Sequence, residues 1–184
     1  MKIAVVGRGW TGKKVFDELS KRGHTVMLIP HESIRYVINS DLDWVVNCAG
    51  ITGSPNVDSC EKIKKETIEA NAIFPSILHN YCVVFGVKMA HFSSGCIYQG
   101  KIDDVNEDPN FFGSIYSISK GVSDSYLKDK ALVFRIRMPF TGARLSPSRR
   151  SCSASPHGLR SKMPFRLLVV MRLNPNSRFP LPMK

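Results

Sequence analysis

The amino-acid sequence predicts an α/β fold with a doubly wound parallel sheet. Short apolar runs alternate with stretches of helical periodicity, which is the order expected when helices cover both faces of a parallel sheet. The first apolar run leads directly into a glycine-rich loop, and a later run ends in two serines. Because open α/β sheets bind ligands at the carboxyl ends of their strands, both features predict where a site lies.

The five expected strands are short apolar runs that end at glycine, proline or polar residues. The first, Lys2–Val6, is rich in β-branched residues and stops at Gly7, and the second, His24–Ile29, stops at Pro30. A third run contains Trp44-Val45-Val46, and a fourth ends at two serines. The bounds expected for the last three strands are residues 43–48, 87–92 and 131–136.

Three helices are expected between these strands. Residues 11–22 place apolar side chains at helical spacing, and Gly23 follows as a stop signal. Residues 61–81 form a longer stretch with an apolar face, which we expect Pro75 to kink because proline lacks the N–H that a helix interior needs. Residues 114–128 form the third helix.

Composition and motif content argue against several classes of protein. Apolar residues make up 43% of the chain, enough for a core, but no apolar run approaches the ~18 residues of a membrane helix. The amino terminus lacks a signal-peptide core, and the five cysteines include no C-x-x-C pair. We therefore expect a cytoplasmic protein without a membrane segment, a disulfide framework or a bound metal.

The loop Gly7-Arg8-Gly9-Trp10-Thr11-Gly12 matches G-x-G-x-x-G between a strand and a helix, the context of a Rossmann-like dinucleotide site. Gly7 allows the tight turn, Gly9 the approach of a pyrophosphate, and Gly12 close packing of the helix, whose amino terminus faces the phosphates. We expect all six residues to form the cofactor site. The pattern G-x-x-x-x-G-K-[ST] fails because Lys14 replaces the hydroxyl residue, and a purely structural glycine turn remains the other alternative.

The choice of dinucleotide depends on the end of the second expected strand. An NAD site usually has an acidic residue there, which binds the ribose 2′-hydroxyl. Here the strand ends at Ile29-Pro30, and Glu32 is the nearest carboxylate. Arg8 could face a 2′-phosphate, although a solvated loop charge is the plainer interpretation. The sequence favours NADP(H), with NAD(H) left open.

A tyrosine and a lysine lie one helical turn apart in the third expected helix. Tyr116 and Lys120 are spaced i and i+4, and Ser93-Ser94 ends the fourth expected strand. A nearby ammonium lowers the pKa of a phenol, so Tyr116 could donate a proton while a serine hydroxyl holds a carbonyl oxygen. With hydride from a nicotinamide, these groups supply what carbonyl reduction needs.

Several motifs together resemble the extended short-chain dehydrogenase/reductase family. The resemblance covers roughly residues 2–139. Within the family, these residues are similar to the branch of UDP-rhamnose 3,5-epimerase/4-reductases and dTDP-4-dehydrorhamnose reductases. The motifs that carry it are the glycine loop, Asn47-Cys48-Ala49-Gly50 with the following residues 51–58, Ser94-Gly95-Cys96-Ile97-Tyr98, Tyr116-x-x-x-Lys120 and Arg137-Met138-Pro139.

The resemblance implies a substrate and roles for individual residues. Enzymes of this branch use NADPH on a nucleotide-linked 4-keto-6-deoxy-hexose, and Ser94 stands at the position of their catalytic serine or threonine. Cys96 stands where the related GDP-fucose synthases have an epimerisation acid/base, with a buried structural cysteine as the alternative. Tyr116 and Lys120 would be catalytic and would also bind the cofactor, together with Asn47, Ala49 and Gly50.

Charge divides the chain into an expected dinucleotide-binding domain, residues 1–141, and a tail, residues 142–184. The formal charge is +2 in the first part and +9 in the second, which has no Asp or Glu and six of the eleven prolines. We expect the tail to be irregular and to reflect a truncation or an altered reading frame where the family has a substrate lobe. A basic arm that binds nucleic acid or an acidic surface is the alternative.

These observations predict an NADP(H)-dependent nucleotide-sugar 4-keto reductase, with 3,5-epimerase activity as an option, in UDP- or dTDP-L-rhamnose synthesis. A non-catalytic dinucleotide-binding remnant and a basic-tailed nucleic-acid binder are the alternatives. The expected partner is the nucleotide-linked 4-keto-6-deoxy sugar, nucleic acid is not favoured, and a homodimer is left open.

Overall fold

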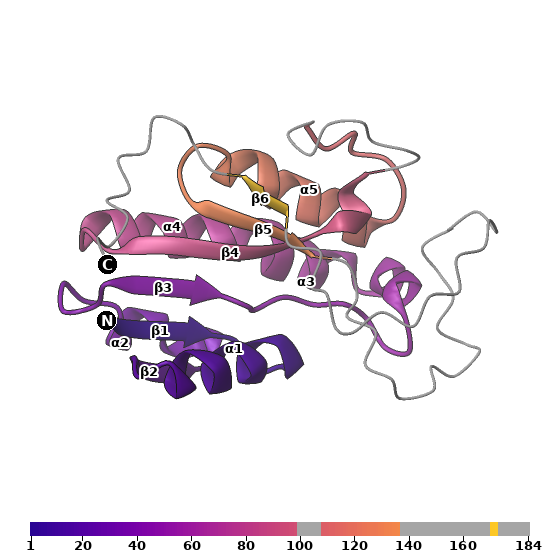
Figure 1. Ribbon diagram of the computed structural model, residues 1–184. Helices are drawn as coiled ribbons and strands as arrows, with labels where there is room; N and C mark the ends of the chain where they lie inside the picture. The colour runs from indigo at the N-terminus through magenta and orange to yellow at the C-terminus, as the bar shows by residue number, and fades with distance from the viewer. Residues whose placement is uncertain (99–107, 137–169, 173–184) are drawn as a thin grey trace.

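The structure is a computed structural model, and the residues that it describes are 1–98, 108–136 and 170–172. One six-stranded sheet, with strand order β2-β1-β3-β4-β5-β6, runs through the molecule (Figure 1). The first five strands are parallel, and β6 pairs antiparallel with β5. The strands are β1 (Lys2–Val6), β2 (Thr25–Ile29), β3 (Trp44–Asn47), β4 (Lys88–Ser94), β5 (Leu132–Ile136) and β6 (Val170–Arg172).

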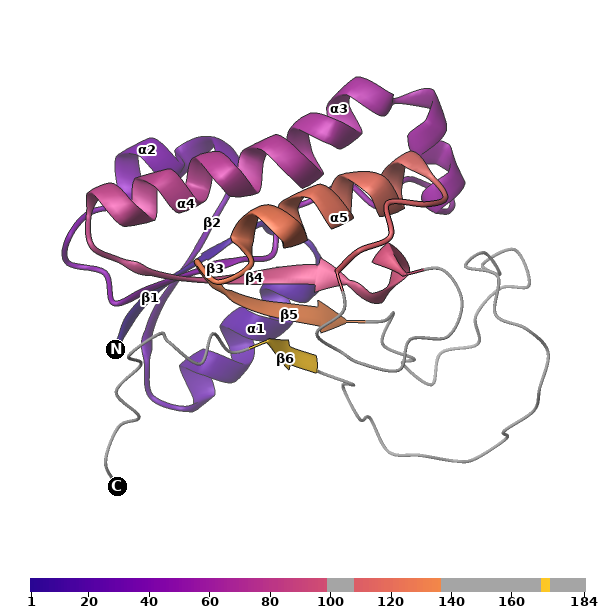
Figure 2. The ribbon, with the colours of Figure 1, turned by 90° about the horizontal axis from the view of Figure 1, so that it is seen from above.

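Helices cover both faces of the sheet, so the predicted doubly wound α/β fold is confirmed. Helix α1 lies on one face, and α2, α3, α4 and α5 lie on the other (Figure 2). These helices are α1 (Trp10–Lys21), α2 (Ile34–Val37), α3 (Lys64–Ile68), α4 (Phe74–Val84) and α5 (Ile115–Leu127). The short 3-10 turns are η1 (His31–Ser33), η2 (Val57–Lys62) and η4 (Gly95–Ile97), and η3 (Glu69–Ile73) is a π-helical turn.

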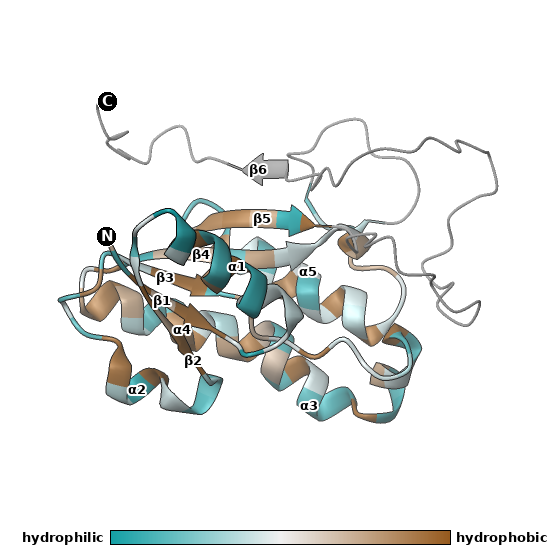
Figure 3. Ribbon diagram, turned by 60° about the horizontal axis from the view of Figure 1, so that its bottom comes forward, coloured by the Kyte–Doolittle hydropathy of each residue, from teal (hydrophilic) through white to brown (hydrophobic). Residues whose placement is uncertain are grey.

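The core has two apolar clusters, one on each face of the sheet. The larger cluster, which includes Val45, Leu78 and Leu127, lies between the sheet and the helices α2, α4 and α5. The smaller one packs the other face of the strands against α1. In Figure 3 the central strands are largely hydrophobic, whereas α1 turns a hydrophilic surface outward. The continuous apolar strands therefore reflect burial on both faces.

The predicted helix over residues 61–81 differs from the structure in two ways. Glu61 belongs to the 3-10 turn η2, and the helix that follows widens into the π-helical turn η3 before α4 begins. Pro75, at the start of α4, cannot donate a helical hydrogen bond, and a π-turn is one way for a helix to absorb such a defect. The irregularity therefore precedes the proline, where we expected a kink.

The structure describes three residues of the tail, and these form β6 on the edge of β5. We expected no regular element in residues 142–184, and for Val170–Arg172 that expectation is wrong. An exposed parallel edge offers unpaired N–H and C=O groups to any strand that reaches it. Arg137-Met138-Pro139 and the rest of the tail lie outside the described residues.

Candidate active site

The three loop glycines have different steric surroundings. Gly7 has a φ of +106°, and a Cβ there would lie 2.7 Å from the backbone nitrogen of Ala49. A Cβ on Gly12 would overlap the carbonyl oxygen of Gly7, so the helix can approach the loop only without a side chain. A Cβ on Gly9 would meet nothing within 4 Å. The loop is therefore tightly packed at both ends and open in the middle.

The amino terminus of α1 faces this open space and fits a dinucleotide pyrophosphate. Gly9 is the residue before α1, and no side chain caps the helix. Its first N–H groups can therefore bind phosphate oxygens. Arg8 and Trp10 are exposed, and Thr11 is half-buried. Beside the loop, the Gly7 N–H donates to the carbonyl of Ile29 at the end of β2, with an N···O distance of 2.9 Å.

The end of β2 carries no carboxylate. After Ile29 the chain continues through Pro30 and His31 to Glu32, whose side chain is 68% exposed and lies 3.4 Å from the His31 ring. An acidic residue directly on the strand end would mark an NAD site, and this strand end lacks one. The geometry is thus compatible with the predicted preference for a 2′-phosphate.

The turn Asn47–Gly50, which follows β3, lies between the glycine loop and Lys120. The Ala49 N–H donates to Asn47 Oδ1 over 3.0 Å and shapes the turn. A Cβ placed on Gly50 would lie only 2.8 Å from Lys120 Nζ. On the other side of the turn, the backbone of Ala49 packs closely against Gly7. This turn therefore joins the two halves of the predicted cofactor site.

Tyr116 and Lys120 both lie on the first two turns of α5 and are almost fully buried. Their exposed fractions are 7% and 5%. The amino terminus of α5 is held by Ser114, whose Oγ accepts from the Ser117 N–H, and by Glu61, whose Oε1 lies 2.6 Å from the nitrogen of Ile115. Tyr116 thus sits in a helical turn that is capped twice.

Burial changes the acid–base properties around Lys120. Removal from water lowers the pKa of Lys120 from 10.5 to about 8, and the nearby Cys48 opposes this change. Burial also raises the pKa of the Cys48 thiol to about 12, with Lys120 acting in the opposite direction. The Lys120 ammonium is thus a buried donor beside Gly50 of the Asn47–Gly50 turn. Such a group fits a ligand that brings acceptors, for example ribose hydroxyls.

Ser94 ends β4 at the carboxyl edge of the sheet. Its Oγ accepts from the backbone N–H of Cys96 over 3.1 Å, which ties Cys96, half-buried in η4, to the serine. The neighbouring Ser93 Oγ is buried and has no hydrogen-bond partner among the described residues. Helix α5 packs against both β4 and η4. The predicted catalytic residues therefore come from neighbouring elements, and their joint action stays a prediction.

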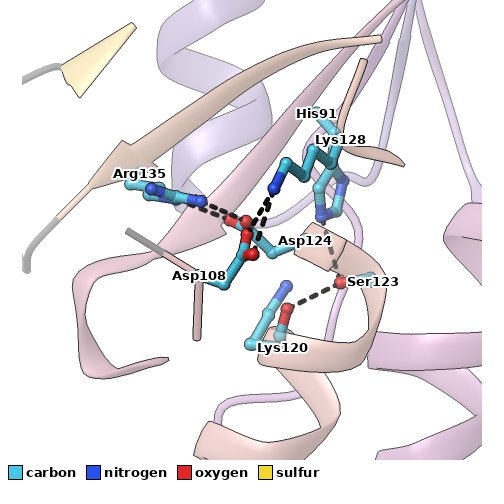
Figure 4. Close-up of polar contacts among 7 residues, drawn as sticks. All are labelled: His91, Asp108, Lys120, Ser123, Asp124, Lys128 and Arg135. Atoms are coloured by element: carbon cyan, nitrogen blue, oxygen red, sulfur yellow. Dashed lines mark hydrogen bonds and ion pairs between the residues drawn. The ribbon is translucent and has the colours of Figure 1, made fainter. Parts of the chain in front are cut away.

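An ion pair anchors α5 to the sheet. Asp124, one turn beyond Lys120, accepts from Arg135 Nε at 2.9 Å and from Arg135 Nη2 at 2.5 Å (Figure 4). Both side chains are at most 3% exposed. The Arg135 guanidinium also lies 5.2 Å from the centre of the Tyr98 ring, just beyond η4. This pair links α5, β5 and the segment that follows Cys96.

Sequence reasoning missed one fully buried polar residue, Asn71. Asn71 lies in the π-helical turn, accepts from the Ile51 N–H at 2.9 Å and donates to the Ile51 carbonyl at 2.8 Å. Its Oδ1 would lie 2.7 Å from a Cβ on Gly50. An asparagine inside a helical stretch was the available signal, since this residue is unfavourable there.

Neither a metal site nor a membrane span is found in the part of the chain that the structure describes. No group of three His, Cys, Asp or Glu side chains is placed to hold an ion within those residues. No described helix is long and apolar enough to cross a bilayer.

Comparison with known proteins supports the resemblance. A family model described as the NAD dependent epimerase/dehydratase family matches residues 3–146. The chain belongs to this family. Residues of the loop, the Asn47–Gly50 turn and α5 all lie within the matched part, which extends seven residues beyond Pro139, where we expected the resemblance to end.

Three relatives illustrate the relationship within the family. A trifunctional UDP-glucose 4,6-dehydratase/UDP-4-keto-6-deoxy-D-glucose 3,5-epimerase/UDP-4-keto-L-rhamnose-reductase of Arabidopsis thaliana is 33% identical, over 96% of this chain and 29% of its own length. A bifunctional dTDP-4-dehydrorhamnose 3,5-epimerase/reductase of the same plant is 36% identical, over 56% of this chain and 38% of its own. The crystal structure of the L780 UDP-rhamnose synthase of Acanthamoeba polyphaga mimivirus matches with a TM-score of 0.68 and 28% identity, over 81% of this chain and 60% of its own.

The chain spans less than two thirds of the length of each of these relatives. The alignment with the trifunctional enzyme also takes in part of residues 147–184, although the family match ends at residue 146. The division into a domain of residues 1–141 and an unrelated tail therefore stays a prediction.

Proposed function

We propose that this chain carries an NADP(H)-dependent site for reducing the 4-keto group of a nucleotide-linked 4-keto-6-deoxy-hexose, with 3,5-epimerase chemistry at the same site. The observation that carries the proposal is that Lys120, buried one helical turn after the buried Tyr116 on α5, lies beside Gly50 of the Asn47–Gly50 turn, whose Ala49 packs against Gly7 of the glycine loop. The UDP- and dTDP-linked activities in the names of the relatives support the substrate class.

The reduction step assigns one task to each side chain. Bound NADPH supplies the hydride. Tyr116 donates its phenolic proton to the carbonyl oxygen, and the Lys120 ammonium stabilises the phenolate that remains. Because the pKa of Lys120 is about 8, this ammonium is mostly protonated at neutral pH. The Ser94 hydroxyl donates a hydrogen bond to the same carbonyl oxygen and holds it in place.

Epimerisation would use Cys96 as the group that exchanges a proton on a carbon next to the ketone. The hydrogen bond from the Cys96 backbone N–H to Ser94 Oγ keeps the residue that carries the proposed base close to the residue that holds the ketone. A ketone held by hydrogen-bond donors has more acidic neighbouring C–H bonds, so the two functions can share one oxygen site.

The preference for NADP(H) rests on charge. Arg8 is exposed inside the glycine loop, and the end of the adjacent β2 has no carboxylate to repel a 2′-phosphate. An arginine is suited to a phosphate because its planar donors can bind two oxygens at once. We expect Arg8→Ala to weaken NADPH binding more than NADH binding.

Thermal unfolding of the full chain with each dinucleotide tests the cofactor site. At 100 times its Kd, NADPH should add about 2.7 kcal/mol of stability and raise Tm by roughly 5–10 °C. Gly9→Val should abolish this shift, because its side chain occupies the space that the pyrophosphate needs. Absence of a shift with millimolar NADPH and NADH would remove the cofactor proposal.

Assays with the 4-keto-6-deoxy sugar test the chemistry. Tyr116→Phe should keep NADPH binding and lose about two to four orders of magnitude in reduction, the scale of a positioned proton donor. Cys96→Ser should slow the uptake of solvent deuterium at the epimerised carbons more than it slows reduction of an epimerised substrate. Equal losses in the two assays would mean that Cys96 only packs the site.

A further inference from the structure

A row of buried polar groups connects β3, β4 and α5 beneath the candidate site. Asn47, His91 and Ser123 are fully buried. Asn47 Nδ2 lies 3.0 Å from His91 Nδ1, and His91 Nε2 lies 3.5 Å from Ser123 Oγ. Ser123 Oγ in turn lies 3.0 Å from the carbonyl oxygen of Lys120 (Figure 4). The row therefore leads from the Asn47–Gly50 turn to the backbone of Lys120.

The partners determine the direction of every hydrogen bond in this row. Asn47 Oδ1 accepts from the Ala49 N–H, so the NH2 group of the same amide faces His91. His91 Nδ1 must then be the acceptor, and the ring proton lies on Nε2. The Nε2–H points to Ser123 Oγ, whose own hydrogen goes to the Lys120 carbonyl. Each hydrogen is used once, with the 3.5 Å contact the weakest.

The ring is also held neutral. Burial, with a further contribution from the charge of Lys120, lowers the pKa of His91 well below its ordinary value of 6.5. A neutral imidazole has one donor and one acceptor, which is the pair that the row requires.

Asn47 transmits this arrangement to the site. The Asn47 amide could point either way by a half-turn of its side chain, and only one orientation offers Oδ1 to Ala49. The Ala49 N–H and a bare His91 Nδ1 favour the same orientation from the two ends of the amide, so loss of the His91 acceptor removes half of this restraint. Ala49 and Gly50 then lie where they contact Gly7 and Lys120.

We propose that His91 is a positioning residue, whose Nδ1 holds the Asn47 amide and through it the Asn47–Gly50 turn between the glycine loop and Lys120. The inference rests on the proposed function in one respect, namely that this site binds a dinucleotide. The tautomer itself does not depend on that function.

Nitrogen NMR of the full chain, labelled at its histidines, tests the tautomer. The signals of His91 are identified as those that disappear in His91→Asn. In the wild-type spectrum they should show a proton on Nε2 and a bare Nδ1. Asn47→Asp provides a matched reversal: a carboxylate cannot donate to Nδ1, so the proton of His91 should move to Nδ1. A wild-type proton on Nδ1, or an unchanged tautomer in Asn47→Asp, overturns the inference.

Three variants separate positioning from simple packing. His91→Leu fills the space without an acceptor and should weaken NADPH binding at least fivefold. The Oδ1 of His91→Asn can reach the position of Nδ1, so that variant should bind NADPH within about twofold of wild type. His79→Leu is the control, because His79 is also buried but lines a cavity of about 190 Å³ with Val87 and Lys88, at the start of β4. It should lower Tm without changing NADPH affinity.

Equal affinity in folded His91→Leu and wild type would overturn the inference, and so would equal losses in His91→Leu and His91→Asn. If His91→Leu does not fold, the two NMR measurements still decide. A wild-type chain that binds neither NADPH nor NADH would instead refute the proposed function, whatever the tautomer of His91.

Discussion

Replacing Lys120 by methionine should stabilise the folded protein at neutral pH. The ammonium is 5% exposed, and burial lowers its pKa from 10.5 to about 8. Each pKa unit corresponds to about 1.4 kcal/mol, so holding the charge in place costs the folded state about 3 kcal/mol. Methionine has a similar length and no charge, and it therefore removes this cost while it keeps most of the packing.

The pH dependence of unfolding provides a second test of the buried Lys120 charge. Because the folded pKa of Lys120 lies below the unfolded one, the unfolded chain binds more protons between about pH 8 and pH 10.5. The contribution of Lys120 to stability therefore rises with pH across this window. The advantage of Lys120→Met should be about 3 kcal/mol at pH 7 and should shrink toward zero near pH 10.5.

Urea unfolding of both proteins between pH 7 and pH 10.5 measures this difference. Burial raises the pKa of Cys48 and of Cys82 to about 12, so these thiols should lower the stability of both proteins above pH 9. Only the difference between the two proteins is therefore informative. A variant less stable than wild type at pH 7, or a difference independent of pH, would refute the reasoning.

Three further changes probe the packing of the site by urea unfolding. Gly12→Ala should lower the free energy of unfolding by about 1–3 kcal/mol or more, because its Cβ overlaps the Gly7 carbonyl. Gly9→Ala should change it by no more than about 0.5 kcal/mol, and equal losses in the two variants would contradict this packing. Asp124→Asn should cost about 3–5 kcal/mol, since the Arg135 charge stays buried without its counterion, and a cost below 1 kcal/mol would contradict this. Asn71→Ala should cost about 1–3 kcal/mol by leaving the backbone of Ile51 unpaired, and an unchanged midpoint would count against it.

The elements that sequence reasoning located best are those with local signals. The predicted strand Lys2–Val6, which ends before Gly7, is β1 with the same bounds. The predicted strand over residues 131–136 differs from β5 by one residue. Both runs are largely apolar and rich in β-branched residues, so composition alone distinguishes them from turns. The glycine loop was equally predictable, because its motif is local in sequence, and Gly7 and Gly12 both lie where a side chain would not fit.

The features that were missed depend on contacts between distant segments. Glu61 caps α5 from 54 residues away, and nothing near it in the sequence indicates this. The π-helical turn at Glu69–Ile73 combines a local cause, Pro75, with a distant one, the pairing of Asn71 with Ile51. Periodicity predicts a helix there correctly, but it cannot predict which turn widens.

Along β4, the buried residues are apolar at the start of the strand and polar toward its carboxyl end. Met89 and Ala90 lie in the apolar clusters, whereas His91, Ser93 and Ser94 toward the carboxyl end are polar and buried. Each such group costs free energy unless it is hydrogen-bonded. Functional sites tolerate such a cost where a ligand or a reaction needs the polar group, so buried polar residues at a strand end are a second indication of a site beside the motifs. Lys120 on α5 belongs to the same buried polar region, and the stabilisation expected for Lys120→Met measures what burying its charge costs the folded state.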